Sequence, residues 1–242
     1  NRWKQPDHTQ WSIRSADYLT NSAKPKQVTA SPAFELVGVQ VLSSDFPIQH
    51  AAESTRSLRH FLAEDAASED PSFFFVCAWM IPGPPFHFMV QLFRRAVKPG
   101  DDPPFDTAWE RFVAGDDAYR NSRLKQIALF QEAPWMVKAT MSNLGGLRPC
   151  IIGNKLTTQH FTGHNYVEVN MDVSSSKVAS MLKGVILKSA AGMVIDCAWL
   201  IEGQEEDELP ERLVGASRWT HCDMNKVGTW LDEDGNEIKE DR

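Results

Sequence analysis

Two segments of this chain, 120 positions apart, have closely similar sequences. Residues 73–83 read Phe-Phe-Phe-Val-Cys-Ala-Trp-Met-Ile-Pro-Gly, and residues 193–203 read Met-Val-Ile-Asp-Cys-Ala-Trp-Leu-Ile-Glu-Gly. A repeated segment of this kind indicates one supersecondary unit that is used twice. Each copy must bury its apolar face, and the other copy is the natural partner, so we expect a fold in which two similar units pack together.

The predicted elements around the two segments also occur in the same order. The first unit spans residues 34–96 and the second spans residues 164–222. Both read strand, helix, strand, strand, because apolar residues alternate in the strands and recur at helical spacing between them. The first unit is expected to contain strand 34–41, a short helix ending at Leu62, strand 73–81 and strand 86–93. The second is expected to contain strand 166–173, a serine-capped helix over 177–190, strand 193–202 and strand 213–221.

This order predicts an α+β fold in which an antiparallel sheet wraps around helices, as in a double hot-dog arrangement. The alternative is the helix-grip fold of START-like lipid-transfer domains. We place it second because the chain does not end in the long amphipathic helix that closes the cavity of such domains.

We expect one domain over residues 1–224, which is long enough to bury roughly three quarters of its unfolded surface. Residues 97–160 are predicted to form an insert between the units, helical over 106–129 and with short strands or turns near 135–137 and 151–152. Residues 225–242 are predicted to be a polar tail, with a hairpin that turns at Asp234-Gly235.

The net charge and the cysteines limit which classes of binding partner and which cellular compartment we expect. The formal net charge is -7, which argues against nucleic acid as a partner, because phosphate binding needs clustered Lys and Arg. The four cysteines form no C-x-x-C pair, and neither a signal peptide nor an apolar run of about twenty residues occurs. We therefore expect reduced thiols and a cytoplasmic protein, with any membrane contact peripheral.

The densest polar cluster lies at residues 115–125. If this segment is helical, Arg120 and Arg123 share one face, and together with Lys125 they are candidates for binding an anionic headgroup. The competing interpretation is a solvated helix face whose charges pair with one another, because exposed pairs of this kind are common and contribute little.

Asp196 is the most unusual single residue, since it interrupts an otherwise apolar strand. Its counterpart in the first copy is Val76. A carboxylate inside a sheet requires a charged partner or a proton. We expect a clamp by an arginine such as Arg120, Arg123 or Arg218, and keep a poised acid as the alternative. Asp172, which precedes a run of serines, is expected to cap a helix.

Large aromatic and methionine side chains supply much of the apolar content. Trp79 and Trp199, one in each copy, are candidates for lining a ligand cavity, although filling a core is the more common role of such residues. The acidic segment 202–211 is expected to be a solvated connection. The histidines at 160 and 164 lie in a strand-like pattern that does not align them on one metal, so we assign no metal ligand and no cofactor.

Short motifs over about nine tenths of the chain occur in an order that is characteristic of a known family. They lie at residues 1–3, 6–7, 18–19, 75–85, 112, 115–125, 134–135, 153–156, 163–169, 172–175, 194–196 and 208–215. In this order they resemble the C-terminal domain of the plant enhanced-disease-resistance-2 proteins and their protist relatives.

The resemblance implies a modest amount about function. In plant members this domain follows a phosphoinositide-binding pleckstrin-homology module and a steroidogenic-acute-regulatory-type lipid-transfer module, in proteins similar to negative regulators of defence and cell death. It implies no catalytic residue. The chain departs from the family pattern at Ala133 and by the extra residues Gly145–Arg148, which puts the loop from 132 to 150 in doubt as a common site.

We therefore predict a non-catalytic domain that binds a lipid or other apolar small molecule. Its candidate ligand-binding residues are Arg120, Arg123, Lys125, Trp79, Trp199 and Asp196. Two alternatives remain open, an acyl-thioester hydrolase of the double hot-dog type that would use Asp172 or Asp196, and a protein-interaction domain without a ligand. Common enzyme signatures such as a nucleophile elbow or a P-loop are absent.

Overall fold

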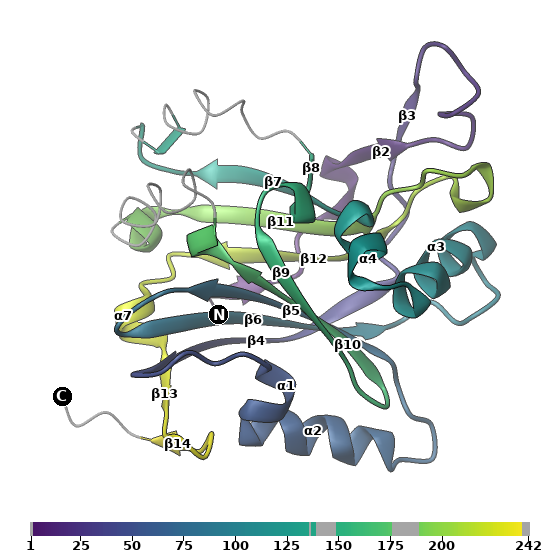
Figure 1. Ribbon diagram of the computed structural model, residues 1–242. Coiled ribbons are helices and arrows are strands. Elements are labelled where there is room, and N and C mark those ends of the chain that lie inside the picture. The colour runs from purple at the N-terminus through teal and green to yellow at the C-terminus, as the bar shows by residue number, and fades with distance from the viewer. Residues whose placement is uncertain (1, 136, 139–148, 176–188, 239–242) are drawn as a thin grey trace.

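The computed structural model describes residues 2–135, 137–138, 149–175 and 189–238, and within this part the fold is α+β with more residues in strands than in helices (Figure 1). The strands are β1 Trp3–Lys4, β2 Ser12–Arg14, β3 Lys26–Val28, β4 Phe34–Ser44, β5 Phe74–Ile81, β6 Phe86–Arg95, β7 Leu124–Glu132, β8 Cys150–Ile151, β9 Thr157–Thr162, β10 Tyr166–Asp172, β11 Val194–Ile201, β12 Leu213–Thr220, β13 Thr229–Leu231 and β14 Glu237–Ile238. The helices are α1 Ala51–Ser54, α2 Arg56–Ala66, α3 Pro103–Ala114, α4 Asp117–Arg123 and α7 Met224–Val227. Short 3-10 turns lie at His8–Gln10, Ile152–Asn154, Val173–Ser175, Ala190–Gly192 and Glu206–Glu208.

Two large sheets make up most of the described structure. One has five strands in the order β1-β12-β11-β7-β8, and the other has seven in the order β14-β13-β4-β6-β5-β10-β9. Most neighbouring strands are antiparallel, while β5 with β10 and β4 with β13 are parallel. The hairpin of β2 and β3 forms a separate small sheet. The predicted α+β class with antiparallel sheets is confirmed.

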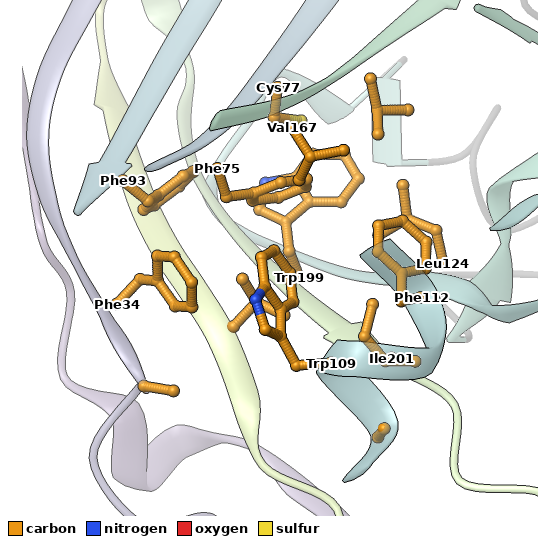
Figure 2. Close-up of a cluster of buried hydrophobic side chains, with 14 of the residues drawn as sticks. Phe34, Phe75, Cys77, Phe93, Trp109, Phe112, Leu124, Val167, Trp199 and Ile201 are labelled. Atoms are coloured by element: carbon orange, nitrogen blue, oxygen red, sulfur yellow. The ribbon is translucent and has the colours of Figure 1, made fainter. Parts of the chain in front are cut away.

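The main hydrophobic core lies between the two large sheets (Figure 2). Phe75, Phe93 and Val167 from the seven-stranded sheet pack with Trp199 from the five-stranded sheet. Trp109 of α3 packs against the same cluster. The sheets approach closely where β12 passes β6, since a Cβ on Gly215 would lie 2.5 Å from the Phe93 ring. Only glycine fits there without moving Phe93.

The outer face of each sheet is covered by a different part of the chain. Leu58 and Leu62 of α2 pack on the seven-stranded sheet, on the face turned away from the other sheet. On the five-stranded sheet, Trp11 and Ile13 near the N-terminus pack against outward-facing side chains of β7, β11 and β12. Each sheet therefore has covered regions on both faces. For this reason many outward-facing positions of these strands are apolar as well.

The two similar units use their strands differently. In the first unit, β4, β6 and β5 are neighbours in one sheet. In the second unit, β11 and β12 are neighbours in the five-stranded sheet, but β10 belongs to the seven-stranded sheet and pairs with β5. Most of the helix predicted over 177–190 lies outside the described residues. The repeat, the hot-dog arrangement and the helix-grip alternative therefore stay predictions.

The helix predicted over 106–129 is wrong over its last six residues, 124–129. α3 and α4 account for its first part, but the chain becomes strand β7 at Leu124. Residues 124–132 are rich in helix-forming Leu, Lys, Gln and Ala, and pairing with β11 overrides that preference. The sequence patterns also missed β3 and β9, whereas the predicted hairpin near Asp234-Gly235 is present as β13 and β14, with β13 attached to β4.

Candidate functional site

Two tryptophans at equivalent positions of the similar segments meet between the sheets. The ring centroids of Trp79 on β5 and Trp199 on β11 lie 5.7 Å apart. Trp199 is fully buried, while Trp79 is half-buried. The side chains of Cys77 and Cys197, two residues earlier in each strand, also point into the space between the sheets. The structure thus brings together the two aromatic residues that the sequence nominated for a ligand cavity.

A buried glutamine joins the two sheets next to these tryptophans. The Gln91 Oε1 atom on β6 accepts hydrogen bonds from Trp199 Nε1 at 3.2 Å and from Ser217 Oγ at 2.6 Å. Trp219 Nε1 donates to Ser217 Oγ at 3.1 Å. Gln91 is completely buried, and its amide nitrogen has no hydrogen-bond partner among the residues that the structure describes. No pattern in the sequence marked this residue, since a single polar position in an apolar strand is common.

Packing between the sheets is uneven along their length. Around α3 the inward-facing side chains are almost completely buried, as Phe75, Phe93 and Trp199 illustrate. Farther from α3, inward-facing apolar side chains on five strands keep contact with solvent. These half-buried residues are Val39, Trp79, Met89, Ala128, Phe130 and Ile195. The inward-facing apolar side chains that keep solvent contact therefore gather beside Trp79 and the end of β7.

The three cations predicted to bind a headgroup are already occupied. Arg120 donates to the main-chain oxygens of Phe112 and Val113, which terminate α3. Arg123 Nη1 lies 2.7 Å from Glu208 Oε2, and Lys125 Nζ lies 2.5 Å from Glu211 Oε1. All three cationic side chains are buried.

The acidic partners come from the segment 202–211, which is not the solvated connection that the sequence suggested. Glu208 and Glu211 are 1% and 4% exposed. Burial by itself raises the pKa of Glu208, but hydrogen bonds from the Gln204 N–H, Arg111 and Arg123 outweigh burial and lower that pKa below its ordinary value. That prediction failed because the charges pair with a segment about 85 positions away, which local composition does not reveal.

Asp196 lies on the outer face of its strand and is clamped by Arg218, one of the three arginines that the sequence offered as partners. The Arg218 Nε and Nη2 atoms each lie 2.6 Å from one carboxylate oxygen, and the side-chain amides of Gln10 and Gln131 donate to Oδ2. Asp172 accepts from the Ser174 N–H at 2.7 Å and caps a 3-10 turn. Each carboxylate therefore has a structural role in the described contacts.

Metal binding would require clustered His, Cys, Asp or Glu side chains, and covalent chemistry would require a reactive thiol. Among the described residues, no cluster of three or more His, Cys, Asp or Glu side chains could hold a metal ion. Burial raises the pKa of the Cys77 thiol well above its ordinary value and that of Cys197 to about 12. Such thiols stay protonated near neutral pH and are poor nucleophiles.

A second polar cluster lies outside the space between the sheets, where α1 meets β10. The Glu168 carboxylate is fully buried and accepts the N–H groups of Ala51 and Ala52 at 2.7 and 2.9 Å. Burial is the main reason that the pKa of Glu168 rises to about 7. His50 Nε2 lies 3.7 Å from Glu168 and 2.9 Å from the Tyr166 hydroxyl. The cluster fastens α1 to the sheet.

A surface groove beside α3 was not anticipated from the sequence. It has a volume of about 940 Å³, with Phe73, Val97, Trp109 and Val113 among its apolar lining. Asp70, Lys98 and Glu110 also line it, so its charges are mixed. The groove is a rival location for an apolar ligand.

The chain belongs to the family of C-terminal domains of the protein ENHANCED DISEASE RESISTANCE 2, whose sequence pattern it matches over residues 3–223. It is also 29% identical, over 228 residues, to an Arabidopsis thaliana protein named "Protein ENHANCED DISEASE RESISTANCE 2-like". That match covers 94% of this chain and 29% of the relative, so the chain spans under a third of the relative's length. No solved structure matches the chain.

Membership of this family confirms the resemblance seen in the motifs. The matched segments 115–125 and 208–215 turn out to contact each other, because Arg123 and Lys125 in the first pair with Glu208 and Glu211 in the second. Within the described part of the chain, no helix is long and apolar enough to cross a bilayer.

Proposed function

We propose that this domain is a non-catalytic binding module that holds one apolar ligand, such as an acyl-chain lipid, between its two sheets. The supporting observation is the row of inward-facing apolar side chains that keep solvent contact beside Trp79 and the end of β7. Side chains that face an opposite sheet normally lose that contact to close packing. An apolar ligand would remove the remaining exposed area from water.

The chemistry of these side chains suits an elongated hydrocarbon. Met89 is unbranched and adapts to irregular shapes, and Trp79 offers a broad apolar surface. Burial of apolar area contributes about 25 cal/mol per Å², so a long chain can be held without any ion pair. This is consistent with Arg120, Arg123 and Lys125 serving the fold. A headgroup contact at these three cations, like a peripheral contact with a membrane, stays a prediction.

Among the described residues, no contact specifically supports the thioester hydrolase or the interaction domain without a ligand. A thioester hydrolase would need a carboxylate free to act at an open junction, whereas Asp172 caps a turn and Asp196 is clamped by Arg218. An interaction domain without a ligand is the conclusion to draw if the binding experiment below fails.

The experiment is native mass spectrometry of protein purified without detergent, followed by titration with a pyrene-labelled fatty-acid methyl ester. Ala128→Trp fills the space between the sheets, and Ala114→Trp makes the same change in the groove beside α3. We expect the first variant to weaken binding at least tenfold and the second to leave it within about twofold. The opposite pattern would move the site to the groove, and no binding by the parent protein would overturn the proposal.

A further inference from the structure

We infer that the ligand carries a neutral hydrogen-bond acceptor, such as an ester, ketone or amide carbonyl, which receives the side-chain amide of Gln91. This inference rests on the proposed function and specifies the chemistry of its ligand. It identifies Gln91 as the polar contact in an otherwise apolar site, a role distinct from that of the cations on α4 and β7.

The orientation of the Gln91 amide follows from its partners. An indole N–H can only donate, so the atom of Gln91 that faces Trp199 Nε1 must be the oxygen. The Ser217 hydroxyl, whose oxygen already accepts from Trp219, also donates to this oxygen. If the oxygen and nitrogen of the amide were exchanged, the Gln91 NH₂ group would face the Trp199 N–H, and two donors cannot form a hydrogen bond. The NH₂ group is therefore directed away from both partners.

That NH₂ group is buried and has no acceptor within the described part of the chain. A buried donor without a partner destabilises a protein, and unsatisfied groups of this kind are rare in native structures. A ligand oxygen would remove the penalty on binding, so the vacant donor favours a ligand that presents an acceptor.

The surroundings of Gln91 select a neutral acceptor. Val39 and Cys77 flank it on the neighbouring strands, and Ser217 and Trp199 face it from the other sheet. None of these four side chains carries a charge at neutral pH. An ionised carboxylate buried here would lack a cationic partner and would be strongly disfavoured, whereas an ester or ketone oxygen needs only the hydrogen bond.

The position of Gln91 also sets where the hydrocarbon lies. Met89 is two residues away on the same face of β6, and Trp79 is the cross-strand partner of Met89. A carbonyl at Gln91 thus directs the attached chain toward the half-buried residues beside Trp79. Gln91 and Met89 thus lie on the same face of β6, next to Trp79.

The test compares two probes that differ in one group, 1-dodecylpyrene and methyl 12-(1-pyrenyl)dodecanoate. Binding of both is measured by fluorescence titration to the parent protein, to Gln91→Met and to Ser217→Ala. The matched control, Ser217→Ala, removes one donor to the Gln91 oxygen but keeps the NH₂ group. Circular dichroism checks that both variants are folded.

We expect the parent protein to bind the ester about 5- to 10-fold more tightly than the hydrocarbon, the factor that one net hydrogen bond provides. Gln91→Met should abolish this preference and leave hydrocarbon affinity within about twofold, while Ser217→Ala should retain it. If Gln91→Met does not fold, NMR of the parent provides the readout, because the Gln91 side-chain amide signals should shift with the ester and not with the hydrocarbon.

Other outcomes separate the inference from the proposed function. Equal affinity of the parent for both probes would overturn the acceptor inference and leave the proposed function standing. A preference that survives in Gln91→Met would also overturn it, since the acceptor would then be received elsewhere. Failure of the parent to bind either probe would overturn both.

Discussion

Trp79 and Trp199 occupy the same position in two similar segments 120 residues apart, and their rings contact each other between the two sheets. The side chains three positions earlier in the two segments also face the same way as each other. Val76 and Asp196 both point to the outer face of their sheets, where Val76 packs beneath the helices and Asp196 meets Arg218. The two segments thus differ on their outer faces more than on their inner ones.

Loss of the Glu208 charge should destabilise the fold strongly. Glu208→Gln leaves Arg123 buried without its ion partner and weakens the contact to Arg111, so we expect the free energy of unfolding to fall by about 3 kcal/mol. Urea denaturation measures the change. The matched control is Glu35→Gln, whose partner Arg94 is largely exposed, and a shift below about 1 kcal/mol is expected there. Equal effects of both substitutions would contradict a buried network.

Stability should depend on pH through Glu168. Because burial raises its pKa from 4.5 to about 7, folding favours the protonated form. The stabilising contribution is present below about pH 4.5 and is lost as the pH rises through 7, with a total on the order of 3 kcal/mol. In Glu168→Gln this component should disappear. Urea denaturation at several pH values compares the two proteins, and parallel curves between pH 5 and 8 would refute the prediction.

Thiol reactivity should report burial between the sheets. With raised pKa values, Cys77 and Cys197 should react with a thiol reagent at pH 8 far more slowly than a free cysteine does. In denaturant all four cysteines should react at once. Mass spectrometry of alkylated peptides identifies which residues were modified, and rapid native-state labelling of Cys197 would show that this part of the core opens readily.

Asp196 should matter for stability and not for ligand binding. Asp196→Asn removes the charge that pairs with Arg218 on the outer face of the sheet, so unfolding should become easier by about 2 kcal/mol. Affinity for the pyrene ester should stay within about twofold, since the side chain points away from the proposed site. A tenfold loss of affinity in a folded variant would restore Asp196 as a ligand contact.

Local sequence patterns predicted much of the architecture. The strands of the first unit, the later strands of the second unit and the C-terminal hairpin were recognised from alternation and turn residues, which act over a few positions. β7 was assigned as helix because its residues favour a helix in isolation, and its strand form depends on β11, some 70 positions later. Sheet partners are set by tertiary packing, which no local pattern encodes.

In the candidate site, too, some residues could be predicted from the sequence and others only from tertiary contacts. Trp79 and Trp199 were nominated from the repeat and do meet, whereas Gln91 gave no signal because its importance comes from Ser217 and Trp199 on the opposite sheet. Arg123 and Lys125 were recognised as unusual, but their carboxylate partners were not. Charge pairing across long sequence separations could have been suspected only from the presence of both segments in the family pattern.

The parallel pairing of β10 with β5 has a consequence for how the chain can be divided. Severing it in the loop before α3 would give two fragments, each with one of the similar units, yet neither would be an independent body. The first fragment would present the edge of β5 from Phe74 onward as an unpaired template for aggregation. The second would contain β10 and β9 without the sheet that holds them. The two units are similar in sequence, but neither is expected to fold alone. They should therefore fold and unfold together in one cooperative transition.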